Sequence, residues 1–166
     1  MKTKLITITL ILTSISLLGQ SVSKSELKNI LKETLTKSRD YVSGATNSWF
    51  YNNSQNDYKI QDTLTFSIAR NYKINYCKIV NWTFSKWNSF RLEFADYCEE
   101  PPIKSASNDN DYYEFIIEEN DDIVFVLLKN VNGIQDKFKV IELTENELID
   151  SGNYQFDYTI KLKRIK

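Results

Sequence analysis

From Trp49 onward, the chain alternates apolar and polar residues with a period of two, in segments separated by turn residues, and this pattern limits the fold more than any other feature. A period of two is typical of β-strands that have one face in a core and the other in water. The closing segment shows it most clearly, because Tyr154, Phe156, Tyr158, Ile160 and Leu162 alternate with polar residues. The segments that we predict to be strands are Ser48–Tyr51, Thr63–Ile68, Tyr72–Tyr76, Ile79–Phe84, Ser89–Phe94, Tyr112–Glu118, Ile123–Lys129, Lys137–Leu143, Glu147–Asp150 and Tyr154–Lys163.

Short strands joined by short turns pair with their sequence neighbours and form a meander. A meander of about eight to ten strands hides its edges by closing into an up-and-down antiparallel β-barrel. We therefore predict an all-β barrel, in which the long last strand pairs with the first. Asn132-Gly133 and Ser151-Gly152-Asn153 are hairpin signals. Residues 52–62 and 98–111 are polar, and the second segment holds both prolines, so we expect loops there.

The N-terminal residues 1–19 have the layout of a secretory signal peptide. Lys2 and Lys4 precede an apolar run that only Thr and Ser interrupt, and the small residue Gly19 follows it. The run is shorter than the roughly 20 residues of a membrane-spanning helix, and no later segment is long and apolar enough for one. A buried N-terminal helix is the alternative. We divide the chain into the signal peptide at 1–19, a helix and linker at 20–47, and a barrel domain at 48–166.

After the signal peptide the period changes from two to that of a helix. Leu27, Ile30, Leu31 and Leu35 recur along one side, and Ser23 with Glu26 forms a capping-box pattern at the start. The apolar stripe is narrow. We therefore predict one amphipathic helix over residues 23–41 that lies across the sheet or the mouth of the barrel.

The chain has two cysteines, Cys77 and Cys98. A signal peptide sends them to an oxidising compartment, where a single disulfide between them is the simplest prediction, and two separate buried thiols are the alternative. We expect the protein to be exported, either to the periplasm or out of the cell. The acidic residues slightly outnumber the basic ones, 22 to 21, and no block of Lys or Arg is present, so nucleic acid is not an expected partner.

Several local phrases resemble the strands of small lipocalin-like domain proteins that Bacteroidetes-type bacteria secrete. These are "DTLTF" (62–66), "YKIN" (72–75), "VNWTF" (80–84), "FRLEF" (90–94), "VIELTENELI" (140–149) and "YTIKLKRI" (158–165), in the order of that family. The resemblance implies a barrel fold and a small-molecule ligand. It also implies a structural pair, in which the guanidinium of Arg164 lies on the indole of Trp49 and closes the base of the barrel. The family's Gly-x-Trp start is absent, and a minimal lipocalin lacks the preceding helix.

Catalytic motifs are missing from the sequence. The chain contains no histidine, which excludes Ser-His-Asp and Cys-His hydrolases and removes the commonest metal ligand. Residues 107–114 bring three carboxylates together but lack the Gly and the later Glu of a calcium loop. A second acidic cluster, residues 118–122, could hold an acid–base pair, but its spacing fits a hairpin tip equally well. We therefore predict a protein that is not an enzyme and has no metal or cofactor.

Aromatic residues are abundant, at 13% of the chain. A barrel of about eight strands is just wide enough for packed side chains or for one small ligand. The residues that we expect to line such a ligand are Phe66, Tyr72, Ile74, Trp82, Phe84 and Phe94. A core that these side chains fill completely is the alternative, because periodicity does not report empty space.

Two functions follow from these alternatives. The first is a secreted, non-catalytic, lipocalin-like barrel that binds a small apolar molecule in its interior. The second is an exported scaffold with a solid core, which contacts another protein through its helix and loops. The enclosed volume separates them, since an apolar space of about 300 Å³ or more favours the ligand.

Overall fold

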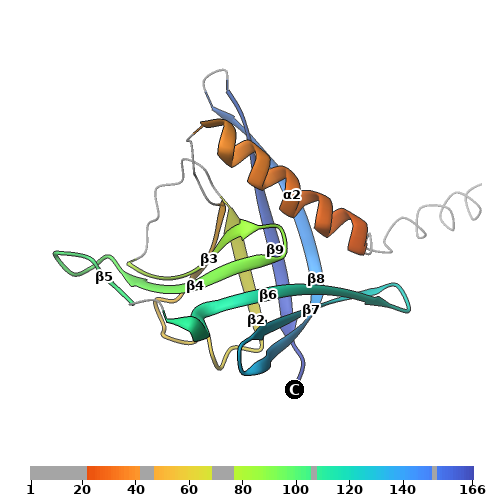
Figure 1. Ribbon diagram of the computed structural model, residues 1–166. Coiled ribbons are helices and arrows are strands. Elements are labelled where there is room, and N and C mark those ends of the chain that lie inside the picture. Colours follow the sequence, from red (N-terminus) through yellow and green to blue (C-terminus); the bar gives the residue numbers. More distant parts are fainter. Residues whose placement is uncertain (1–21, 42–46, 69–76, 106–107, 151–152) are drawn as a thin grey trace, which may run out of the picture.

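The computed structural model describes residues 22–41, 47–68, 77–105, 108–150 and 153–166. These residues form one α-helix, one short 3-10 helix and nine strands (Figure 1). The elements are α2 (Lys24–Tyr41), β1 (Asn47–Asn52), β2 (Thr63–Ile68), β3 (Lys78–Lys86), β4 (Ser89–Asp96), β5 (Ile103–Lys104), η2 (Asp109–Asp111), β6 (Tyr112–Asn120), β7 (Ile123–Asn130), β8 (Gly133–Asp150) and β9 (Asn153–Arg164).

Eight of the strands form a closed antiparallel barrel, which confirms the predicted fold class. Around the barrel the order is β2, β1, β3, β4, β6, β7, β8, β9 and back to β2. The ninth strand, β5, pairs only with the end of β4. Closure gives each of the eight strands a neighbour on both sides, although the far ends of β8 and β9 extend beyond β7 and β2 and, among the described residues, pair only with each other.

The strand order differs from a simple meander in one place. The last strand β9 pairs with β2 over six residues, from Thr63↔Lys163 to Ile68↔Tyr158, and not with the first strand as predicted. Strand β1 instead lies between β2 and β3, and it pairs with β3 along its whole length. The only described residue pair between β1 and β2 is Phe50↔Ser67. The segment between β2 and β3 therefore joins two strands that are not neighbours.

Most strand positions agree with the alternation of the sequence. The expected strands at 137–143 and 147–150 are parts of a single strand, β8, with a register shift between Val140 and Glu142. The prediction of an uninterrupted loop at 98–111 was wrong, because this segment contains β5 and η2. The expected strand Tyr72–Tyr76, the signal peptide and two residues of the Ser151-Gly152-Asn153 signal lie outside the described residues.

Helix α2 lies across one end of the barrel, and the C-terminus lies at the other end (Figure 1). The capping box is present, since the backbone N of Glu26 donates to Ser23 Oγ at 3.1 Å and the backbone N of Ser23 donates to Glu26 Oε2 at 3.4 Å. Leu27, Leu31 and Leu35 are buried against the barrel. The predicted amphipathic helix and its position over the mouth are therefore confirmed.

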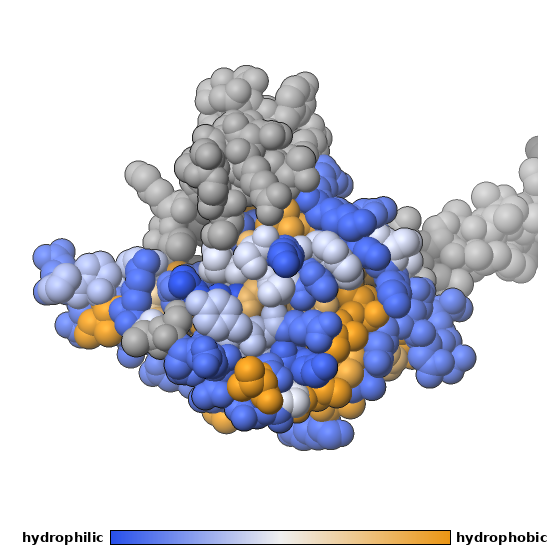
Figure 2. Space-filling view, in the orientation of Figure 1, coloured by the Kyte–Doolittle hydropathy of each residue, from blue (hydrophilic) through white to orange (hydrophobic). Residues whose placement is uncertain are grey.

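Two tight turns join the strands β6, β7 and β8. Asp121 and Asp122 both have positive φ, 49° and 60°, so the acidic cluster at 118–122 is the tip of a hairpin. Gly133 has φ 97° next to a register shift in the β7–β8 pairing, where glycine adopts the left-handed backbone without strain. The Asn132-Gly133 signal thus marks a hairpin, as predicted. On the face shown in Figure 2, hydrophilic residues cover most of the described surface.

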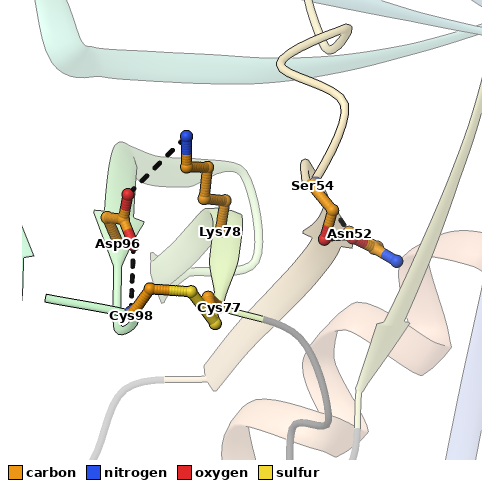
Figure 3. Close-up of a disulfide and its surroundings, with 6 residues drawn as sticks. All are labelled: Asn52, Ser54, Cys77, Lys78, Asp96 and Cys98. Carbon is orange, nitrogen blue, oxygen red and sulfur yellow. Dashed lines mark hydrogen bonds and ion pairs between the residues drawn. A yellow bond between two sulfur atoms is a disulfide. The ribbon is translucent and has the colours of Figure 1, made fainter.

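The disulfide between Cys77 and Cys98 is present, as predicted (Figure 3). It joins the start of β3 to the segment after β4, with the two Cα atoms 4.9 Å apart. The backbone N of Tyr97 donates to the carbonyl oxygen of Cys77 at 2.8 Å, and Lys78 forms an ion pair with Asp96 at 3.8 Å. The bond therefore fastens the segment that leads into β5 to the rim of the barrel.

We predict that the double variant Cys77→Ser/Cys98→Ser is less stable than the parent by about 3 kcal/mol. The two residues are 21 positions apart, and a cross-link of that span restricts the unfolded chain by about this amount. Urea unfolding measures the loss. Dithiothreitol should lower the midpoint of the parent to that of the variant and leave the variant unchanged. Equal midpoints for parent and variant would contradict the prediction.

Candidate ligand site inside the barrel

Three of the six predicted ligand-lining residues lie inside the barrel. Phe66, Trp82 and Phe84 are each no more than 2% exposed. Phe94 is only partly buried, and its ring contacts that of Tyr58 edge-on, with the centroids 5.8 Å apart. Tyr72 and Ile74 lie outside the described residues.

The interior is filled by a cluster of aromatic rings around Trp82. The Trp82 ring centroid lies 4.0 Å from that of Phe66 and 5.0 Å from that of Phe90. Phe115 and Phe138 follow at 6.1 Å and 6.3 Å. Contacts at these distances are those of a packed core. The side chains that we expected to surround a ligand therefore surround one another.

Helix α2 closes the barrel at one end and leaves almost no space beneath it. The apolar space there measures about 10 Å³. It is lined by Leu27, Leu31, Trp49, Trp82, Phe84, Phe115 and Ile160. A space of this size holds at most one water molecule, far below the roughly 300 Å³ of a ligand pocket.

The loop between β1 and β2 closes the other end by inserting Tyr58 into the core. Tyr58 is 4% exposed, and its hydroxyl oxygen accepts a hydrogen bond from Trp82 Nε1 at 3.1 Å. Asn53 Oδ1 accepts from the backbone N of Tyr58 at 3.1 Å, which holds the loop in place. The alternation of the sequence did not predict this plug, because one tyrosine in a polar loop has no periodicity.

Arg164 locks the same end, although with a different partner from the one predicted. Its guanidinium lies over the ring of Phe138, 5.0 Å from the centroid, and not on Trp49. It also forms an ion pair with Asp136 and donates from Nη2 to the carbonyl oxygen of Tyr58 at 2.8 Å. Trp49 instead lines the small space under α2. Arg164 still closes the base of the barrel, because its strand register places it opposite Phe138.

The titratable groups at this end are held in their neutral or paired forms. Burial raises the pKa of the Tyr58 hydroxyl, and the hydrogen bond from Trp82 opposes this only in part. Burial also raises the pKa of Tyr51, and the hydrogen bond that Tyr51 donates to Asp57 at 2.7 Å adds to the effect. Both phenols therefore stay protonated at neutral pH and act as hydrogen-bonding groups of the core.

A second space lies on the outside of the barrel, beside β5. It is an open groove of about 280 Å³. Its lining residues are Asn53, Asn56, Lys78, Ile79, Phe94, Ala95, Asp96, Ile103 and Ser105. The backbone N of Phe94 donates to Ser105 Oγ at 3.0 Å, and the backbone N of Ser105 donates to the carbonyl oxygen of Phe94 at 2.9 Å, so the arm that carries β5 is tied to β4.

Within the described residues, no group of three or more Cys, Asp or Glu side chains is arranged to hold a metal ion. In the same part of the chain, no helix is both long and apolar enough to cross a membrane. Comparisons with protein-family models, with curated proteins and with solved structures found no match to this chain. The class that the geometry defines is a closed β-barrel with a packed interior, plugged at one end by a helix and at the other by a loop.

Proposed function

We propose that this protein is an exported, non-catalytic barrel with a solid core, which binds another protein through its outer loops. The observation that supports this proposal is the packed interior, where the apolar space under α2 is about 10 Å³. A lipocalin-like barrel that holds a small apolar molecule needs an interior pocket that these side chains do not leave. Interior binding is therefore the alternative that the experiments below must exclude.

The loop surface beside the disulfide is the place where we expect the partner to bind. Ile103 is 60% exposed and Tyr97 is 42% exposed, on either side of the cross-linked segment. The disulfide (Figure 3) fixes one part of this segment to the start of β3, and two hydrogen bonds between Phe94 and Ser105 fix the part that carries β5 to β4. A rigid, exposed apolar side chain beside a groove is a suitable anchor for a partner, because little conformational entropy is lost on binding.

Site-specific photocrosslinking tests the proposal. We replace Ile103 with benzoylphenylalanine and, as a matched control, replace exposed Lys86 on the β3–β4 hairpin in the same way. In the producing cell, position 103 should yield a discrete product that contains a different protein, and position 86 should not. The additional substitution Tyr97→Asp should reduce the yield of the crosslinked product from position 103.

Binding of a small apolar molecule inside the barrel, the competing function, can be measured directly. A well-folded parent protein that binds a fatty acid or N-phenylnaphthylamine at micromolar concentration, with quenching of tryptophan emission, would support interior binding. That result, together with no crosslinked product at position 103, would overturn the proposal. The solid core predicts instead that neither probe binds.

A further inference from the structure

The outer face of strands β2, β9 and β8 carries an excess of positive charge. The buried residues Phe66, Leu162 and Phe138 point inward, so their neighbours in sequence point outward. We use the name lysine face for the outward residues Thr63, Thr65, Ser67, Lys137, Lys139, Glu142, Thr144, Thr159, Lys161 and Lys163.

Two lysines of this face stand directly opposite each other. Lys139 on β8 is paired in register with Lys163 on β9, and Lys163 has Thr63 as its partner on the other side. Like charges in this position repel and destabilise a sheet. Lys161 lies two residues before Lys163 on β9, with Thr65 and Glu142 as its register partners. The barrel thus concentrates three ammonium groups on adjoining positions, at a cost in stability.

In the part of the chain that the structure describes, these three lysines lack a carboxylate partner at ion-pair distance. Among the described residues, Lys139, Lys161 and Lys163 form no ion pair within 4.0 Å. Glu142 Oε1 accepts a hydrogen bond from the Thr144 hydroxyl at 3.1 Å instead. The neighbouring lysines are paired, Lys137 with Glu118 at 3.9 Å and Lys166 with Asp62 at 3.1 Å. The charge of the three central lysines is therefore free to act on something outside the chain.

Exposed isoleucines border the same face. Ile141 on β8 is 43% exposed at the register shift beside Glu142, and Ile165 is 40% exposed directly after β9. The backbone N of Ile165 donates to the carbonyl oxygen of Lys137 at 2.8 Å, which places it beside the lysine face. Ile134, near the start of β8, is 58% exposed. The surface thus combines cationic groups with apolar side chains that water solvates poorly.

We propose that the lysine face binds peripherally to the anionic headgroups of a lipid surface. Lysines at such a surface are attracted by its negative potential, and neighbouring apolar side chains enter the boundary between headgroups and acyl chains. A soluble polyanion would match the lysines but would leave the three isoleucines in water. A lipid surface accommodates both kinds of side chain, and it requires no groove in the protein.

Vesicle sedimentation with the full chain tests this proposal. The probe is a vesicle of equal parts phosphatidylglycerol and phosphatidylcholine, compared with pure phosphatidylcholine. The parent should bind the anionic vesicle more tightly, and added salt should weaken the binding. Lys163→Glu should weaken it by about tenfold or more, whereas Lys86→Glu, with the same change of net charge, should leave it unchanged. All three proteins share the same N-terminal segment, so differences between them report on the lysine face.

The melting temperature separates lost binding from lost folding. Lys163→Glu places opposite charges at the Lys139 position, so the variant should melt at the same temperature as the parent or above it. Ile141→Asn should weaken binding to anionic vesicles at high salt, where the apolar contribution dominates. If Lys163→Glu and Lys86→Glu weakened binding to anionic vesicles equally, the proposal would be overturned. The proposal would also be overturned if inorganic polyphosphate fully displaced the protein from anionic vesicles and Ile141→Asn had no effect on vesicle binding.

Discussion

Replacing Trp82 with alanine should destabilise the protein by about 3 to 5 kcal/mol, the usual cost of emptying a large aromatic site in a packed core. Trp82 is 2% exposed, and four aromatic rings lie within 6.3 Å of its ring centroid. The substitution also removes the indole N–H that donates to the buried hydroxyl of Tyr58. Urea or thermal unfolding measures the change.

The same variant should gain a ligand that the parent does not bind. An apolar cavity on the order of 150 Å³ in a rigid core stays dry and accepts benzene-sized molecules. Benzene or indole should therefore raise the melting temperature of Trp82→Ala and leave that of the parent unchanged. If the alanine variant fails to fold, Trp82→Phe offers a smaller loss of volume at the same position.

Trp87→Ala is the matched control. Trp87 packs only partly against the core, and Lys28 Nζ lies 4.6 Å from its ring centroid. Its replacement should cost about 1 kcal/mol or less and should create no ligand site. A parent protein that binds benzene as well as the Trp82 variant does would show that the interior already contains usable space, which contradicts a solid core.

The alternation of the sequence predicted the strands well because it depends only on which side of a strand faces the core. Thr63–Ile68 has the predicted bounds, and Val80, Trp82 and Phe84 of β3 and Phe90 of β4 are buried in the core on the expected parity. Leu92 and Phe94 of β4 are only partly buried. The order of the strands around the barrel needs more information. The six residues of β1 carry no pattern that predicts which strands they pair with. In the structure all six pair with β3, and only one described pair joins β1 to β2.

Whether the barrel is hollow could not be predicted from periodicity either. The alternation identified Phe66, Trp82 and Phe84 as inward residues, and all three are buried. It did not report that α2 and the loop of Tyr58 close both ends, because those contacts join residues far apart in sequence. The partner of Arg164 was missed for the same reason, since Phe138 lies opposite it only through the β8–β9 register.

Arg164→Met should destabilise the protein by about 3 kcal/mol at neutral pH. The side chains of Arg164 and Asp136 are only 14% and 23% exposed, and removing one partner of a buried ion pair leaves the other charge without compensation. The variant also loses the hydrogen bond to the Tyr58 carbonyl oxygen and the contact with Phe138. Guanidinium unfolding at several pH values measures the loss.

The destabilisation should depend on pH in a defined direction. Burial raises the pKa of Asp136 above its ordinary value, and the Arg164 guanidinium offsets this only in part. When the pKa of an acid is higher in the folded state than in the unfolded state, its protonation favours folding. This contribution to stability is fully present below the unfolded-state pKa and is lost as the pH rises through the folded-state pKa. Without the guanidinium the pKa of Asp136 rises further. The stability gap between Arg164→Met and the parent should therefore be largest near pH 7 and should narrow as the solution is acidified towards about pH 4.

A double variant distinguishes the buried charge from the lost packing. In Arg164→Met/Asp136→Leu no charge is left at the base of the barrel, and replacing a buried pair by apolar groups of similar size is often neutral for stability. The double variant should therefore recover most of the loss, and its stability gap to the parent should no longer follow the ionisation of Asp136. A single variant whose deficit is the same at pH 4 and pH 7, and which the second substitution does not rescue, would show that Arg164 acts by packing on Phe138 alone.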